Sequence, residues 1–328
     1  MEQAIELRNV RKTFGANVAV NDVSLVVPRG AVYGVIGPSG AGKTTCIRMI
    51  MSILFPDSGS LSVLGHASAL EAKDRIGYLP EERGVYRKMR VGAFLTYLAQ
   101  LKGVSRETAT ARVPDLLERV GLRGTERTAC DELSKGMLQR VQFVGAVLHE
   151  PELLILDEPF SGLDPVSVRL LREEVRRAHA RGATILLSTH IMAYAEEMCD
   201  HVFMIHEGRK VLDQPMAGLR RQFDPRRVLF EPLHADASVS GIAAMPDVVK
   251  VEAAEGGGYT VTLVDGAEPS LTVARIAALV PPARIEIARL RLEDVFVRIV
   301  AGGGGGLDEA AAALRSRLQA GAAEEARA

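Results

Sequence analysis

The 328-residue sequence predicts an α/β fold with a parallel sheet, followed by a small α+β unit. Two apolar runs, "ELLILD" (152–157) and "ATILLSTH" (183–190), lie on either side of a helical segment at 164–182. A buried strand, a helix and another buried strand are typical of parallel strands joined by a crossover helix. A further apolar run, "AVYGVI" (31–36), precedes a glycine-rich loop and indicates another strand.

The composition is that of an ordinary globular protein. Hydrophobic residues make up 47% and charged residues 25% of the chain, which argues against wholesale disorder. At ~100–200 residues per domain, the length predicts roughly two domains. The formal net charge of -1 gives no electrostatic reason to expect nucleic acid or an anionic membrane surface as partner.

Cysteine usage and apolar runs bear on the compartment. Cys46, Cys130 and Cys199 lie far apart, with neither metal-ligand spacing nor a disulfide framework, which suits a reducing cytosol. The opening "MEQAIELRNV" lacks the basic and then apolar pattern of a signal peptide. No apolar run approaches the ~20 residues that span a bilayer, so any membrane part is expected from another chain.

The first elements are predicted to be strands and then one helix. Between residues 5 and 35, short apolar runs are broken by Asn, Asp, Gly and Pro, which is a strand pattern. A helix is expected over "TTCIRMIMSIL" (44–54). Pro56 and the turn "PDSG" should end it.

The middle third, from about residue 85 to 141, is predicted to be helical. Apolar residues recur every three or four positions in 92–103 and again in 105–122. Pro114 interrupts the second pattern, and we expect it to kink or restart that helix. In "LSKGMLQR" (133–140), polar residues and a glycine precede an apolar segment, which indicates a helix start.

A different unit is predicted from about residue 226. The order strand, helix, strand, strand, helix and strand indicates a ferredoxin-like domain over 226–300. The run "GGGGG" from Gly302 is typical of a flexible linker. The rest of 301–328 is Ala-rich, and we expect a helical tail without a fixed position.

The glycine-rich loop "GPSGAGKTT" matches the phosphate-binding pattern G-x-x-x-x-G-K-[ST]. The predicted strand before it and helix after it are the context that this pattern requires. Backbone N–H groups and the helix N-terminus would bind phosphate oxygens, Lys43 would reach the β- and γ-phosphates, and Thr44 could ligand Mg²⁺. A chance glycine turn is the alternative. The candidate phosphate-binding residues are Gly37, Pro38, Ser39, Gly40, Ala41, Gly42, Lys43, Thr44 and Thr45.

Two adjacent carboxylates end the apolar strand in "LLILDEP". Asp157 would hold magnesium, directly or through water, and Glu158 would polarise the attacking water as general base. His190 ends the next strand, where it could contact the γ-phosphate or the water. Solvated acids in a turn and a structural histidine are the alternatives. The carboxyl edge of an open α/β sheet, where ligands bind, favours the functional interpretation.

Together these motifs resemble the nucleotide-binding subunits of ABC transporters. The phosphate loop, "LSKGMLQR", "LLILDEP", "SGLD" and His190 occur in that family's order and spacing, and the similarity covers about residues 1–214. The resemblance implies a P-loop NTPase of ABC type, with an ATPase domain over 1–218 and a helical subdomain at about 85–141. It also implies ATP and Mg²⁺ as cofactors and ATP hydrolysis as the reaction.

The resemblance further implies a homodimer in which each signature motif closes over the ATP held by the other copy. "LSKGM" stands where the family usually has LSGGQ, so Ser134 and Gly136 match while Lys135 and Met137 depart. Ser134 and the helix start would bind the γ-phosphate of the neighbour's ATP. Asp164 in "SGLD" matches the loop that crosses between the copies.

Phe14 and Glu81 are two further candidates near the expected nucleotide. Phe14 matches the aromatic that stacks on adenine, although a half-buried strand aromatic is nearly as good an interpretation. Glu81 stands where the family usually has Gln, a contact to magnesium and water that couples to the membrane partner. Glu still offers an oxygen to Mg²⁺ but adds a negative charge near the triphosphate. It would therefore belong to both the nucleotide and the metal site.

"LPEERG" and "LEDVFVRIV" resemble sodium- and drug-export ATPases that carry a small C-terminal domain. By this analogy the chain powers export through a separate integral-membrane permease, and is cytoplasmic and peripheral on the inner face of the cell membrane. No nucleic acid is expected as partner. The alternatives are a soluble ABC ATPase of DNA repair or translation, and a regulatory module that nucleotide binding alone switches.

Overall fold

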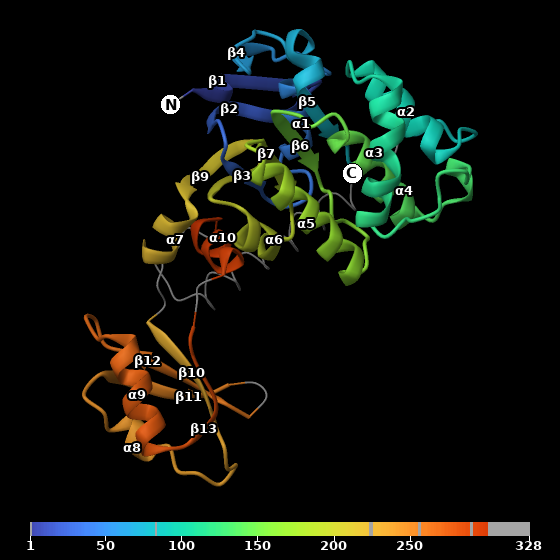
Figure 1. The fold of residues 1–328 in the computed structure, drawn as a ribbon. Coiled ribbons are helices and arrows are strands. Elements are labelled where there is room, and N and C mark those ends of the chain that lie inside the picture. Colours follow the sequence, from blue (N-terminus) through green and yellow to red (C-terminus); the bar gives the residue numbers. More distant parts are fainter. Residues whose placement is uncertain (1, 83, 223–225, 255–256, 289–290, 301–328) are drawn as a thin grey trace, which may run out of the picture. The chain divides into compact units, whose positions relative to one another are not determined.

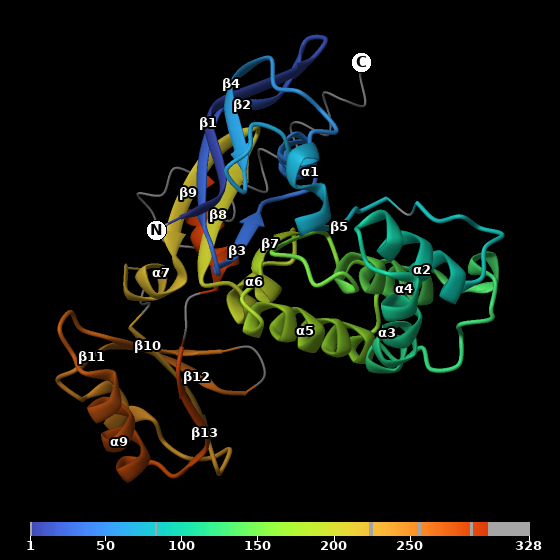
Figure 2. The same ribbon diagram turned by 45° about the horizontal axis from the view of Figure 1, so that its top comes forward.

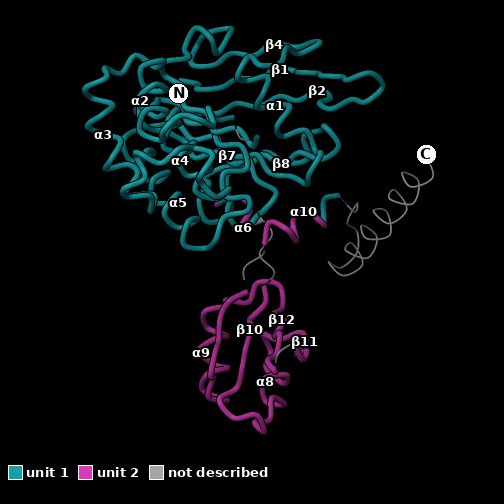
Figure 3. The backbone as a smooth tube through the Cα atoms, turned by 90° about the vertical axis from the view of Figure 1, so that its right-hand side faces the viewer, with its two compact units in different colours: residues 1–216, 298–328 teal, residues 217–297 magenta. Residues whose placement is uncertain are grey.

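The computed structural model describes the chain except residues 1, 83, 223–225, 255–256, 289–290 and 301–328. The predicted linker and tail therefore lie outside the described residues. Two compact units are present: residues 1–216 with the described residues from 298 on, and residues 217–297 (Figure 3). None of the helices in the described part combines the length and apolar character needed to cross a bilayer.

The first unit is built on a six-stranded sheet (Figure 1). Its neighbouring strands are parallel from β5 to β8, while β9 runs antiparallel to β8. The expected parallel sheet is thus confirmed, with an antiparallel edge. In spatial order the strands are β5 (Ile76–Leu79), β6 (Leu153–Asp157), β7 (Thr184–Thr189), β3 (Val32–Ile36), β8 (His201–His206) and β9 (Arg209–Pro215).

A second, antiparallel sheet holds β2 (Asn17–Pro28), β1 (Gln3–Phe14) and β4 (Ser58–Val63), in that order (Figure 2). One apolar core joins the two sheets through helix α1 (Lys43–Ile50): Leu7, Ile47 and Ile155 belong to the same buried cluster. Helix α1 is shorter than expected. Ser52 takes a left-handed backbone conformation with φ 56°, so the helix ends before the predicted Leu54.

The predicted helical middle is confirmed, and its three helices lie together in Figure 1. They are α2 (Val91–Leu101), α3 (Arg106–Arg119) and α4 (Lys135–Val147). The expected restart at Pro114 is wrong, because α3 is a single helix that contains this proline. Pro114 has no N–H to donate to the preceding turn. Buried side chains lie on the helix both before the proline, at Ala109 and Val113, and after it, at Leu117, and their packing keeps the helix continuous.

The remaining helices of the first unit connect its strands or follow them. Helix α5 joins β6 to β7 as the predicted crossover, and Asp164 caps its first turn. The helices are α5 (Pro165–Ala180), α6 (Met192–Met198) and α7 (Met216–Gln222), the last of which continues into the second unit, and the short 3-10 helices are Ala69–Arg75 and Cys130–Glu132.

The second unit has the element order predicted for it. A four-stranded antiparallel sheet, in the order β11-β12-β10-β13, packs one face against α8 and α9. Val228, Val261 and Ile276 share its small core. Its elements are β10 (Arg227–Pro232), α8 (Ser240–Ala243), β11 (Val248–Ala253), β12 (Tyr259–Leu263), α9 (Pro269–Leu279) and β13 (Pro282–Ile287), and α10 (Leu292–Val300) follows.

Candidate functional site

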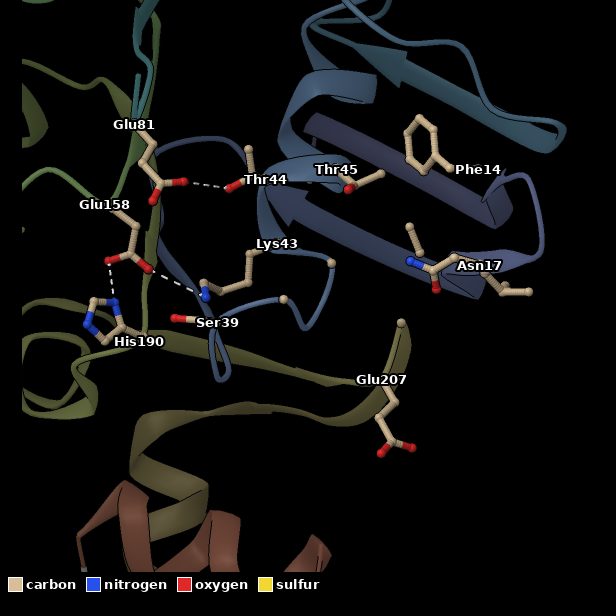
Figure 4. A pocket seen from close by; sticks show the side chains of 15 residues that line it. Phe14, Asn17, Ser39, Lys43, Thr44, Thr45, Glu81, Glu158, His190 and Glu207 are labelled. Atoms are coloured by element: carbon tan, nitrogen blue, oxygen red, sulfur yellow. Dashed lines mark hydrogen bonds and ion pairs between the residues drawn. The ribbon is translucent and has the colours of Figure 1, made fainter. Parts of the chain in front are cut away.

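A cavity of about 550 Å³ lies at the carboxyl edge of the six-stranded sheet, beside the loop between β3 and α1 (Figure 4). Ten of the candidate residues line it: Phe14, Ser39, Gly40, Gly42, Lys43, Thr44, Thr45, Glu81, Glu158 and His190. Five further lining residues were not predicted from the sequence: Asn17, Val18, Ala19, Glu207 and Gly208.

The glycines of the loop allow it to pass close to neighbouring backbone. Gly42 has φ 107°, and a Cβ there would lie 2.5 Å from the carbonyl oxygen of Ala19. At Gly37 a Cβ would lie 2.2 Å from the carbonyl oxygen of Ile205. Side chains are therefore excluded at both positions, and the loop is fixed between the start of β2 and the end of β8. Pro38 contributes its carbonyl oxygen, which accepts from the N–H of Ala41 at 3.2 Å.

Lys43 is buried, with 6% of its surface exposed, yet its ammonium group lies inside the loop. Its Nζ donates to the carbonyl oxygens of Gly37 at 2.9 Å and Pro38 at 3.0 Å. An ion pair joins the same Nζ to Oε1 of Glu158 at 3.4 Å. Loop carbonyls and one carboxylate thus compensate the buried charge.

Thr44 and Asp157 form an oxygen-rich corner. The Thr44 hydroxyl lies 3.3 Å from Oε2 of Glu81 and 3.3 Å from Oδ1 of Asp157. Ser188 donates to the same Oδ1 at 2.5 Å, while Oδ2 of Asp157 is buried and accepts no hydrogen bond from the described residues. Burial raises the pKa of Asp157, and the charges of Glu81 and Glu158 raise it further. A cation at this corner would offset the burial and the repulsion.

Glu158 points away from Asp157, although the two are adjacent. Its backbone is left-handed, with φ 50°, and its N–H is 3.1 Å from the Ser188 hydroxyl. The side chain then reaches Lys43 through Oε1, while Oε2 lies 2.9 Å from Nδ1 of His190 (Figure 4). Only 7% of the Glu158 side chain is exposed, against 42% of that of His190. The carboxylate is therefore held between a lysine and a histidine.

The signature residues do not line the cavity of their own chain. Ser134 caps α4 by accepting from the N–H of Met137 at 3.2 Å, as the predicted helix start requires. Gly136 lies against Leu163 of "SGLD", where a Cβ would be 3.3 Å from the leucine side chain. Asp164 caps α5, and hydrogen bonds led by that from Ser167 lower its pKa. Ser134 and Asp164 are exposed.

Phe14 is at the far side of the cavity from Glu158 and His190 (Figure 4). The residue is 48% exposed, and Nζ of Lys12 lies 5.7 Å from the centroid of its ring. Asn17 is the first residue of β2. Glu207 and Gly208 come from the turn between β8 and β9, and the Gly208 N–H donates to Ala41 O at 3.0 Å. Only tertiary packing brings this second turn to the loop.

Comparison with known proteins shows the family of the chain. The ABC transporter family matches residues 20–161. The uncharacterized ABC transporter ATP-binding protein YhaQ of Bacillus subtilis strain 168 is 36% identical over 90% of this chain and 98% of its own length. The chain belongs to the ATP-binding proteins of ABC transporters. ABC ATPase domains bind ATP and hydrolyse it to power transport, and head-to-tail dimers are typical of them.

Other relatives of this ABC protein have more specific names. The bacitracin transport ATP-binding protein BcrA of Enterococcus faecalis is 30% identical over 93% of this chain and 98% of its own length. The Nod factor export ATP-binding protein I of Burkholderia lata is 39% identical over 64% of this chain and 70% of its own.

Solved structures agree with the ABC ATPase fold. An ATP-binding subunit of an ABC transporter, 35% identical, superimposes with a TM-score of 0.62 over 67% of this chain and 93% of its own. CbiO1 of Clostridium perfringens, part of the ABC transporter complex cbiONQ, gives a TM-score of 0.58 at 24% identity, over 67% of this chain and 91% of its own.

Proposed function

We propose that the chain binds magnesium ATP in this cavity and hydrolyses it with Glu158 as general base. The observation that carries the proposal is the divergence of two adjacent carboxylates. Asp157 lies beside the Thr44 hydroxyl, whereas Glu158 lies between Lys43 and His190. This divergence supports a cation beside Asp157 and a water molecule beside Glu158. The cavity beside the phosphate loop is lined by all the groups that this chemistry needs: Lys43, Thr44, Glu158 and His190.

ATP would lie with its phosphates at the loop and its base at Phe14. The loop supplies N–H groups and the N-terminus of α1, which attract anions. At the other side of the cavity, Phe14 offers a half-exposed ring for stacking on adenine. Gly37 to Thr45 would surround the phosphates, and Lys43 would exchange its contact with Glu158 for one with the γ-phosphate.

Magnesium would be held by Thr44 and Asp157, with Glu81 nearby. The donors are hydroxyl and carboxylate oxygens, which Mg²⁺ prefers. Oδ2 of Asp157 is buried and has no hydrogen-bond partner in the part of the chain that the structure describes, which supports this assignment, since burial without a counter-charge is unfavourable. When bound, the ion would neutralise charge on the β- and γ-phosphates.

Glu81→Gln should make ATP hydrolysis depend less steeply on magnesium concentration. The carboxylate lies 3.3 Å from the Thr44 hydroxyl, so replacing it with an amide removes a negative charge beside the metal. Hydrolysis itself should persist. The measurement is a magnesium titration of turnover for both proteins at saturating ATP. Superimposable curves would limit Glu81 to a contact with the partner or a solvated loop acid.

Glu158 would take the proton of the attacking water, and His190 would orient its carboxylate. The 2.9 Å contact from Nδ1 to Oε2 fixes one oxygen, so that the other can face the cavity once Lys43 turns to phosphate. A positioned base of this kind contributes roughly 10²–10⁴-fold to a rate. His190 is more exposed and could also contact the γ-phosphate.

We infer a head-to-tail homodimer around two ATP molecules. Ser134, Gly136 and Asp164 lie outside their own chain's cavity, and Ser134 and Asp164 are exposed. The Ser134 oxygen accepts from Met137 N–H, which leaves its O–H proton to donate to a phosphate. A second copy facing the first would bring these residues to its nucleotide.

The partner would be a separate integral-membrane permease, with this chain peripheral on the inner face of the membrane and export as the direction. The names of the bacitracin transport and Nod factor export relatives support this assignment. We take residues 1–218 as the ATPase domain, with its helical subdomain at about 85–141. The sheet order of the second unit supports a ferredoxin-like domain over 226–300.

The proposal is tested by purifying the tagged full-length chain after coexpression with membrane proteins encoded beside it. We expect one permease to copurify with the wild type and with Lys43→Ala alike. Magnesium-dependent hydrolysis should fall at least about a hundredfold in Lys43→Ala, because an electrostatic contact to the transferred phosphate is lost. Equal turnover of the two proteins would refute the nucleotide site. Failure of any membrane protein to copurify would refute the transport role.

A further inference from the structure

Gln139 links helix α4 to the loop that carries Glu158. The residue is buried, with 8% of its surface exposed. Its Nε2 donates to the carbonyl oxygen of Pro159 at 2.6 Å and approaches that of Glu158 at 3.4 Å. A side chain of the helix that Ser134 caps therefore holds the backbone just after strand β6.

The Glu158 segment is held from two sides. On one side, the Glu158 N–H lies 3.1 Å from the hydroxyl and 3.2 Å from the carbonyl oxygen of Ser188 in β7. On the other side, the carbonyl groups of Glu158 and Pro159 face the Gln139 amide. A left-handed backbone is unfavourable for a glutamate, so the conformation of Glu158 depends on these contacts to hold it. A movement of α4 would therefore move the carboxylate.

The stability of the fold does not explain why an amide is buried at position 139. Within the described residues its Oε1 is buried and accepts no hydrogen bond. An unsatisfied amide oxygen in the interior carries a desolvation cost that an apolar side chain of the same size does not. The bond from Nε2 to the Glu158 loop is the contact that an apolar residue could not make.

We propose that Gln139 is a positioning residue that couples the two nucleotide sites of the dimer. This inference rests on the proposed function, in which the start of α4 contacts the neighbour's ATP. Ser134 and Gln139 are separated by about 7.5 Å of helix, at ~1.5 Å per residue, so a displacement at one end reaches the other. Binding of ATP to the neighbour would thus adjust Glu158 in the chain's own site.

The test compares Gln139→Met with Gln142→Met in the full-length protein. Both glutamines are 8% exposed on α4, but Gln142 lines a separate cavity of about 290 Å³. In Gln139→Met we expect kcat to fall roughly ten- to hundredfold, as misplacement of a reacting group does. The Hill coefficient for ATP should fall toward 1, with ATP affinity and Tm close to wild type. Gln142→Met should keep the wild-type kcat and Hill coefficient.

A second variant, Gln139→Glu, decides the matter if Gln139→Met does not fold. An ionised carboxylate cannot donate to Pro159 O, whereas a protonated one can. Burial raises the pKa of such a carboxyl, so kcat relative to wild type should recover as pH falls. A ratio that stays constant with pH, or wild-type kcat and Hill coefficient in folded Gln139→Met, would overturn the proposal. Equal losses in Gln142→Met would also overturn it.

Failure of this inference is separable from failure of the ATPase assignment. Wild-type protein that hydrolyses ATP with a Hill coefficient of 1 would end the coupling role and leave the site intact. Undiminished turnover in Glu158→Gln would instead remove the proposed base, whatever the Gln139 variants do.

Discussion

ATP hydrolysis should slow roughly a hundred- to ten-thousandfold when Glu158 is replaced by Gln, while ATP binding is retained. The amide keeps the length of the side chain but cannot take a proton from water. Lys43 and Thr44 remain, so the phosphate contacts survive. The variant should accumulate as an ATP-bound dimer. Phosphate release measures the turnover, and size-exclusion chromatography with and without ATP measures the dimer.

The size of the effect distinguishes a base from a structural acid. A hundred- to ten-thousandfold loss corresponds to about 2.7–5.5 kcal/mol of barrier. Loss of one ordinary hydrogen bond costs only about 0.5–1.5 kcal/mol. Glu173→Gln, which changes a partly exposed carboxylate of α5 that pairs with Arg169 outside the cavity, is the matched control and should turn over normally. Near-normal turnover in Glu158→Gln would leave the carboxylate as a partner of Lys43 and His190 alone.

The parts of the site that the sequence predicts are those with local signals. The phosphate loop is a continuous motif between an apolar strand and a helix, and both elements form on either side of it, although the helix ends earlier than expected. Asp157 is the last residue of β6, and His190 directly follows β7. These two apolar strands are parallel neighbours in the sheet. Because parallel strands end at one edge, their polar ends meet there.

The parts that the sequence misses depend on packing between distant segments. Gly208 reaches the phosphate loop because the turn after β8 packs beside Ala41. In the sequence Gln139 is one of several polar residues of α4, and its contact with Pro159 O is seen only in the structure. The helix through Pro114 is likewise decided by buried neighbours, since the local preference of proline opposes it.

The trans arrangement of the dimer should appear when two inactive variants are mixed. Lys43→Ala removes the phosphate lysine, and Ser134→Arg fills the place of the signature hydroxyl. Ser134 is exposed, so the arginine should not disturb the core. In a mixed dimer with trans sites, one site carries both defects and the other carries neither. The intact site joins Lys43 of the Ser134→Arg copy to Ser134 of the Lys43→Ala copy.

Nucleotide occlusion is the measurement to make, because paired sites that hydrolyse only cooperatively could stay silent in a turnover assay. Mixed dimers, isolated through two different tags, should retain at most about one ATP per dimer, and each variant alone should retain none. If each site were built from a single chain, both sites of the mixed dimer would be defective. Mixed dimers that form and occlude no ATP would therefore show that Ser134 does not serve the neighbour's nucleotide. Ser134→Ala removes the hydroxyl but adds no bulk, so it should lose occlusion less completely than Ser134→Arg.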